Sequence, residues 1–110
     1  MDIENENNHI LIKATEKTFK EFHSAFIDKD LHKVSTHKIV QFPNNIEIVA
    51  SDVASFLSVA NEHKKSGISF VVICNGIAID EIPDAINVVP SVIEAEDLLE
   101  MEAIERDLGF

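Results

Sequence analysis

The sequence predicts an α/β protein in which four to five short, mostly parallel strands are covered by helices. Short apolar segments alternate along the chain with segments of helical periodicity, which is typical of a parallel sheet with crossover helices. Residues 68–74 are nearly all apolar, as in a central strand that is covered on both faces. A chain of 110 residues, 45% of them apolar, suits one hydrophobic core, so we expect residues 9–110 to form a single domain.

The N-terminal part predicts a disordered tail, a strand and a helix. Residues 1–8 (MDIENENN) are polar, and we expect them to be disordered. Residues 9–14 (HILIKA) form a strand candidate, and Thr15 is the expected N-cap of a helix over residues 16–28. The apolar side of this helix carries Phe19, Phe22, Phe26 and Ile27 at helical spacing. We expect the phenylalanines to contact the sheet, and the alternative is a ligand groove that they line.

The middle of the chain predicts a second strand and a second helix. Residues 37–42 (HKIVQF) read as a strand that a Pro-Asn-Asn turn closes. Residues 52–66 are expected to form one helix, capped by Ser51 or Asp52 and ended by Gly67. Residues 68–74 then form the central strand described above.

The C-terminal part predicts a helical turn over residues 77–83, a short strand over residues 86–89 and a final helix. Ser91 and Glu94 form a capping-box pattern at the start of that helix. Its expected buried side consists of Ile93, Leu98, Met101, Ile104 and Leu108. Leu99 and Phe110 lie outside this side and could pack on a second copy, so the sequence leaves the oligomeric state open.

Charge is distributed unevenly along the chain. Residues 1–79 hold ten acidic residues and eight lysines, a balance of −2, whereas residues 80–110 hold ten acidic residues and only Arg106, a balance of −9. Nucleic acid and anionic membranes would be repelled by such a surface. We therefore expect no nucleic-acid or membrane partner, and a protein partner with a basic or mixed surface.

No grouping of residues predicts catalysis, so we expect a protein that is not an enzyme and has no cofactor or metal. The three glycines cannot form a phosphate-binding loop, and the five histidines do not have the spacing of a metal site. His63 is expected to be a solvated surface residue. Cys74, the single cysteine, stands in an apolar run and is expected to be buried. A lone cysteine and the absence of a targeting pattern favour a cytoplasmic protein.

Residues 37–95 resemble a STAS domain, the fold of anti-sigma factor antagonists. They contain a strand, a D-x-x-S helix start, a K-S-G-I-S-F segment at residues 65–70 that leads into an apolar strand, and a later short strand followed by E-A. The resemblance implies a STAS-like sandwich and a regulatory protein that binds other proteins. In this family an N-terminal pair of strands is common, whereas this chain is expected to place a helix directly after its first strand.

The ending of the chain resembles a group of short bacterial STAS-like proteins. The shared motifs are I-D-E-[IV]-P at residues 79–83, V-V-P at 88–90, E-A-E-D at 94–97 and M-E-x-I-E-R-D-L-G-F at 101–110. Members of this group are often encoded beside ribonuclease Z and sometimes carry its label. The H-x-H-x-D-H metal motif of that nuclease is absent from this sequence, so we do not expect nuclease activity.

The resemblance also implies where the regulatory site should be. In the family, a kinase phosphorylates a Ser or Thr at the start of the helix that here begins near Asp52. Val53 and Ala54 occupy the two switch positions, so the switch is degenerate, and Ser51 and Ser55 are the remaining candidate phosphoacceptors. The candidate partner-docking residues are Asp52, Val53, Ser55 and Phe56.

Two functions are therefore expected from the sequence. The first is a non-enzymatic protein-binding or regulatory module. The alternative is a small-ligand-binding STAS-like domain, because the Asn75-Gly76 break follows the central strand at its carboxyl end, where open α/β sheets bind ligands.

Overall fold

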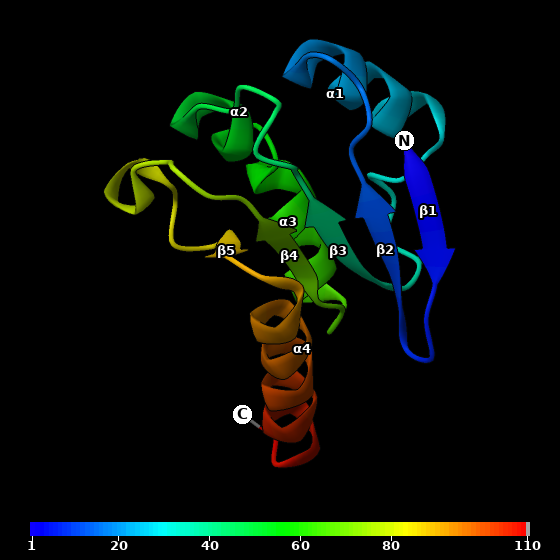
Figure 1. Ribbon diagram of the computed structural model, residues 1–110. Helices are drawn as coiled ribbons and strands as arrows, with labels where there is room; N and C mark the ends of the chain where they lie inside the picture. Colours follow the sequence, from blue (N-terminus) through cyan, green and yellow to red (C-terminus); the bar gives the residue numbers. More distant parts are fainter. Residues whose placement is uncertain (110) are drawn as a thin grey trace.

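A computed structural model describes residues 1–109 and has an α/β architecture with one mixed, mostly parallel sheet (Figure 1). The strands are β1 (Asp2–Asn5), β2 (His9–Lys13), β3 (His37–Gln41), β4 (Phe70–Ile73) and β5 (Asn87–Val89). The helices are α1 (Phe19–Asp28), α2 (Ala50–Ala54), α3 (Leu57–Lys65), the 3₁₀ turn η1 (Ile79–Glu81) and α4 (Val92–Asp107). From β2 onward, the sequence predicts this order of strands and helices, except that it predicts one helix where the structure has α2 and α3.

The sheet has the strand order β1-β2-β3-β4-β5, in which β1 is antiparallel to β2 and the other neighbours are parallel. Alternate residues of each strand point to opposite faces. Val40 and Val72 belong to the core cluster that includes residues of α1 and α3, whereas Ile39 and Val71 belong to the cluster that includes residues of α4. The sheet is thus covered on both faces, and α4 extends past its lower end in Figure 1.

Aromatic side chains fill the core beneath α1 and α3. Phe22, Phe26 and Phe56 are each fully buried. Neighbouring rings lie 4.9–6.4 Å apart between centroids, at distances that favour edge-on and tilted packing. The cluster contains Phe19, Phe22, Phe26, Phe42, Phe56 and Phe70. The prediction that the phenylalanines contact the sheet is confirmed for Phe22 and Phe26, while Ile27 remains 39% exposed.

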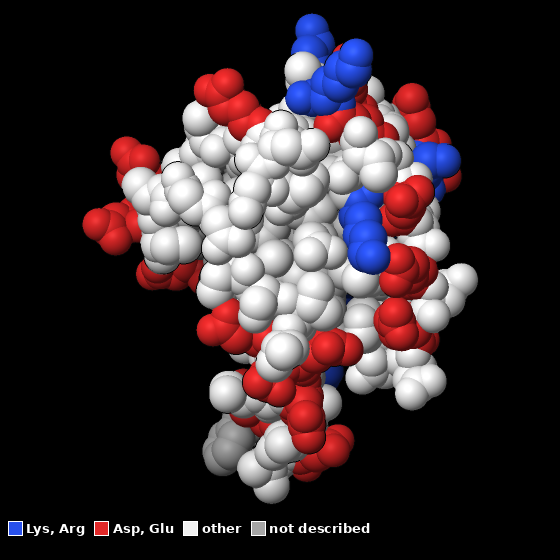
Figure 2. Space-filling view, viewed as in Figure 1, with Lys and Arg blue, Asp and Glu red and all other residues white. Residues whose placement is uncertain are grey.

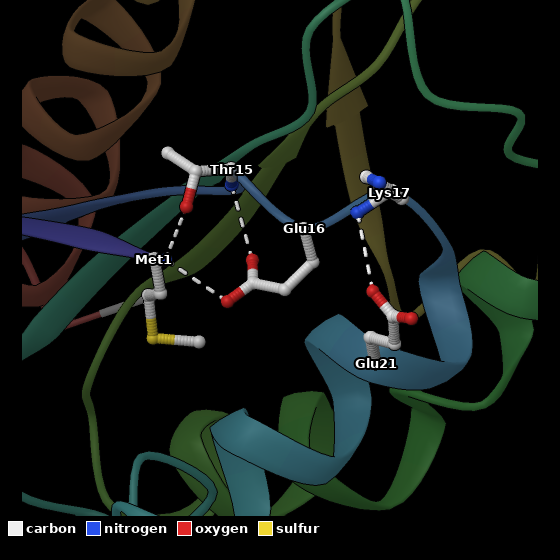
Figure 3. Close-up of polar contacts among 5 residues, drawn as sticks. All are labelled: Met1, Thr15, Glu16, Lys17 and Glu21. Carbon is white, nitrogen blue, oxygen red and sulfur yellow. Dashed lines mark hydrogen bonds and ion pairs between the residues drawn. The ribbon is translucent and has the colours of Figure 1, made fainter.

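The expectation of a disordered N-terminus is wrong for Asp2–Asn5, which form β1. Antiparallel pairing with β2 gives the backbone N–H and C=O groups of this segment hydrogen-bond partners, although its polar composition suggested disorder. Figure 3 shows how this end is anchored: the amino group of Met1 contacts the Thr15 hydroxyl and pairs with Glu16 Oε2 at 2.9 Å. Because Thr15 and Glu16 take part in these contacts, α1 starts later than predicted, with Thr18 as the N-cap that accepts the Glu21 N–H.

The helix predicted over residues 52–66 is two helices, α2 and α3, which meet at Ser55 and Phe56. The Ser55 hydroxyl donates to the Asp52 carbonyl oxygen at 2.6 Å, and such bonds compete with the regular helical pattern. Phe56 is fully buried at the junction. The break therefore lets Phe56 enter the aromatic core.

Helix α4 begins as predicted, because the Ser91 hydroxyl accepts the Glu94 N–H at 3.2 Å. The predicted buried side is wrong. Ala95 and Leu99 are buried, whereas most of the predicted side is exposed. The exposed fractions are 72% for Ile93, 55% for Met101, 53% for Ile104 and 66% for Leu108. Phe110, which the sequence suggested as a self-association residue, lies outside the described residues.

Candidate functional site

The predicted docking residues around the start of α2 differ in their access to a partner. Ser51 and Ser55 are exposed, and Asp52 is partly exposed. Val53 and Phe56 are fully buried. Because both side chains belong to the core cluster under α1 and α3, they cannot contact a partner in this conformation, and their assignment as docking residues is wrong.

The side chain that hydrogen-bonds the backbone at the start of α2 is that of Asp52, and no serine acts as the N-cap. The Asp52 carboxylate accepts the Val49 N–H at 3.1 Å, which stabilises the first turn. Ser51 stands within that turn as an exposed residue, and Val49 is the residue that caps the helix. The prediction of Ser51 or Asp52 as the N-cap is therefore wrong by two or three residues.

Exposed apolar side chains lie beside this turn. Val49 is 47% exposed, and Ile79, in the neighbouring turn η1, is 57% exposed. The two elements α2 and η1 contact each other. This edge of the molecule therefore presents the Ser51 hydroxyl together with apolar surface, and we refer to Val49, Ser51 and Ile79 as the α2 edge.

A hollow of about 400 Å³ opens at the carboxyl ends of β3 and β4. Its lining combines apolar side chains with backbone and polar groups of the Asn75-Gly76 break, and consists of Phe42, Pro43, Asn44, Ile46, Glu47, Ile48, Cys74, Asn75 and Gly76. Cys74 is 6% exposed, which confirms its predicted burial. Burial also raises the pKa of the Cys74 thiol, so this sulfur is a poor nucleophile.

A polar cluster, which the sequence did not predict, lies at the opposite end of the strands from this hollow. The Ser69 hydroxyl donates to Glu102 Oε1 at 2.6 Å and accepts from Arg106 Nη1 at 3.3 Å. The Ser69 N–H donates to His37 Nδ1 at 2.9 Å, and the Asn87 amide donates to Glu102 Oε2 at 3.3 Å. Burial, together with the charge of Arg106, lowers the pKa of His37. We refer to His37, Ser69, Asn87, Glu102 and Arg106 as the polar cluster.

The polar cluster holds α4 on the sheet. Glu102 and Arg106 come from α4, and their partners are Ser69, directly before β4, and Asn87, at the start of β5. His37, at the start of β3, accepts the Ser69 N–H. The Ser69 hydroxyl donates to Glu102 and accepts from Arg106, so this one side chain joins the start of β4 to two positions of α4. No local pattern indicates these contacts, because Ser69 and its partners on α4 are 33 and 37 positions apart in the sequence.

A buried pair, Lys38 and His63, lies on the other face of the sheet. Lys38 Nζ donates to His63 Nε2 at 2.8 Å and to the Lys33 carbonyl oxygen at 2.9 Å, while His63 Nδ1 donates to the Val59 carbonyl oxygen at 2.8 Å. Burial lowers the pKa of Lys38 to about 8 and also lowers the pKa of His63. His63 is fully buried, so the prediction of a solvated His63 is wrong.

Among residues 1–109, no three His, Cys, Asp or Glu side chains are grouped so that they could hold a metal ion. No helix within the same residues has the length and apolar character needed to cross a bilayer.

The sequence matches no protein-family model, and no curated protein is significantly similar to it.

Proposed function

We propose that this protein is a non-enzymatic, regulatory protein-binding module with a STAS-like fold, which resembles an anti-sigma factor antagonist and docks through the α2 edge. The observation that carries the proposal is the exposure of Val49 and Ser51 at the start of α2 and of Ile79 in η1, two elements that contact each other. Exposed apolar side chains gain free energy when a partner covers them. This edge also lies where the sequence resemblance places the family's regulatory helix start.

The topology supports the STAS-like part of the proposal. The strands β2 to β5 are parallel and follow one another in the sheet in chain order, with α1, α2 and α3 in the connections. The N-terminal pair β1 and β2 removes the departure from the family that the sequence suggested. Many domains of that family open with two paired strands.

The serines of this edge are not equivalent phosphoacceptors. The Ser55 hydroxyl is engaged with the Asp52 carbonyl oxygen, whereas Ser51 is exposed in the first turn of α2. A phosphate on Ser51 would lie near the N–H groups of that turn and also near the Asp52 carboxylate. Because Val53 and Ala54 occupy the family's switch positions, we propose that docking does not require phosphorylation.

The test is affinity capture with the wild-type chain and two variants that each replace two exposed apolar residues. Val49→Asp with Ile79→Asp places charge on the α2 edge, and Ile27→Asp with Val34→Asp, the Ile27 variant, places it outside that edge, at residues that are 39% and 38% exposed. We expect one protein to be retained by the wild type and by the Ile27 variant, and to be lost with the double variant. Retention that is equal for all three chains, or no retained protein, would contradict the proposal.

A second candidate function, small-ligand binding, is favoured by the hollow at the carboxyl ends of β3 and β4. Its volume of about 400 Å³ is within the range of small-molecule sites. Native mass spectrometry of the purified protein would then show an adduct of constant mass that Ile48→Trp, a substitution in the lining, removes. A spectrum of the bare chain under native conditions would argue against this function.

A further inference from the structure

Helix α4 has two different long sides. One side faces the sheet and consists of Ala95, Leu99, Glu102 and Arg106, at spacings of four, three and four residues. The other side carries Ile93, Met101, Ile104 and Leu108, at spacings of eight, three and four residues. Both spacings correspond to a single stripe of an α-helix. The apolar stripe on the second side is the outward stripe.

The outward stripe contains four of the most exposed large apolar side chains among the described residues. Each of its members is more than half exposed. Val49 and Ile79 belong to the α2 edge, and the other exposed large apolar side chains, Ile3, Ile27 and Val34, are distributed over separate parts of the chain. Scattered apolar residues are ordinary on a protein surface, whereas several on one helix side indicate an interaction surface.

The charge around the outward stripe is negative. The exposed charged residues of α4 are Glu94, Glu96, Asp97, Glu100, Glu105 and Asp107. Arg106, the only base after residue 79, is turned inward and donates to Ser69. Figure 2 shows acidic side chains over the lower part of the molecule, where α4 extends beyond the sheet.

We propose that the outward stripe of α4 binds an amphipathic helical segment of another protein, whose apolar side is flanked by Lys and Arg. Met101, Ile104 and Leu108 recur at positions i, i+3 and i+7, the spacing at which apolar anchors of a helix recur in recognition between helices. Ile93 continues the stripe two turns earlier, with Asp97 between it and Met101. The acidic residues beside the stripe, together with Asp97 within it, would attract basic residues of the partner and select against acidic ones. Together, these features define both the geometry and the charge of the partner.

Charge also distinguishes this partner from a second copy. Two α4 helices packed through their outward stripes would bring two sets of exposed carboxylates together, and like charges side by side oppose association. A basic segment meets no such repulsion. The proposal concerns a surface separate from the α2 edge and does not depend on the STAS resemblance.

The test uses the full chain and a fluorescent synthetic peptide of about five helical turns, with Leu and Ile on one side and Lys on the other. Fluorescence anisotropy gives the Kd. We expect Met101→Ser with Ile104→Ser to raise the Kd at least about tenfold. The matched control is Ile27→Ser with Val34→Ser, which removes two exposed apolar side chains outside both the outward stripe and the α2 edge and should leave the Kd unchanged.

Two further measurements separate the contribution of the apolar side chains to peptide binding from the contribution of the acidic residues. Asp97→Asn with Glu100→Gln should weaken binding and reduce its dependence on salt, because fewer charges then attract the peptide. A peptide with Glu in place of Lys should not bind. Circular dichroism of each variant should match the wild type, since the changed side chains are exposed.

Three outcomes would overturn the proposal. The first is the absence of peptide binding to the wild type, and the second is an equal Kd for the stripe variant and its control. The third is a dimer in sedimentation experiments that Met101→Ser with Ile104→Ser dissociates, because the stripe would then be covered by a second copy.

Discussion

The two faces of the sheet are stabilised in different ways. Under α1 and α3 lies a large core rich in phenylalanine. The core under α4 contains six buried residues, none of them aromatic, and they are Leu11, Ile39, Val71, Ile73, Ala95 and Leu99. On the α4 face, hydrogen bonds of the polar cluster supplement this smaller apolar contact.

This difference shows how a helix such as α4 can be held on the sheet while one of its apolar sides stays exposed to solvent. The aromatic face gains most of its stability from burial, which scales with apolar area. On the α4 face, Ser69 and Asn87 hold Glu102 and Arg106 toward the sheet, and so fix which side of the helix points inward. The outward stripe remains available for a partner as a result.

The largest expected effect comes from the aromatic face. Phe26→Ala should lower the free energy of unfolding by about 3–5 kcal/mol, because a fully buried ring leaves a cavity that its neighbours cannot fill. Urea denaturation measures this change. Phe19→Ala, at the partly exposed rim of the same cluster, should cost less. A smaller loss for Phe26→Ala than for Leu99→Ala on the other face would contradict the comparison.

A middle-sized effect tests the orientation of α4. Leu99→Ala should lower the free energy of unfolding by about 2–4 kcal/mol, since Leu99 is 4% exposed. Ile104→Ala, on the same helix but 53% exposed, should change it by less than about 0.5 kcal/mol. Thermal or urea denaturation of the two variants measures both changes. A larger loss of stability for Ile104→Ala than for Leu99→Ala would instead support the buried side that the sequence predicted.

The smallest expected effect is a dependence on pH that arises from Lys38 on the aromatic face. Burial lowers the pKa of Lys38 to about 8, from 10.5 for a free side chain. Between these values the unfolded chain binds more protons than the folded chain, so stability rises with pH. Below pH 8 the unfavourable burial of the charge is fully present.

Lys38→Met isolates this contribution. The stability of the wild type minus that of the variant should increase by on the order of 1–2 kcal/mol between about pH 8 and pH 10. Urea denaturation at a series of pH values gives both curves. Parallel curves for the two chains over this interval would show that Lys38 keeps its ordinary pKa in the folded protein.

Much of the fold follows from local patterns. The apolar residues 68–74 predicted a strand covered on both faces, and β4 lies within this range. The helix start at Ser91 was correct because the capping bonds involve residues three positions apart. The α1 phenylalanines were assigned to the core because their helical spacing gives one apolar side, which the burial of Phe22 and Phe26 bears out.

The candidate sites were predicted less well, because they depend on contacts between distant residues. Ser69 bonds Glu102 and Arg106, which lie 33 and 37 positions further along the chain. Nothing near Lys38 in the sequence indicates that it meets His63 inside the protein. The burial of Val53 and Phe56, likewise, follows from how α2 and α3 meet the sheet.

The sequence by itself determined the order of the strands from β2 onward and of the helices between them, apart from the break between α2 and α3. It also determined the aromatic character of one core and the acidic end of the chain, because composition, periodicity and capping act over a few residues. The tertiary structure decided that Asp2–Asn5 pair as a strand and that Val53 and Phe56 are enclosed. It also decided which side of α4 meets water, since a helix with apolar residues on two sides cannot choose between them locally. The sheet made that choice through Ser69 and Asn87, whose hydrogen-bond partners had to face inward.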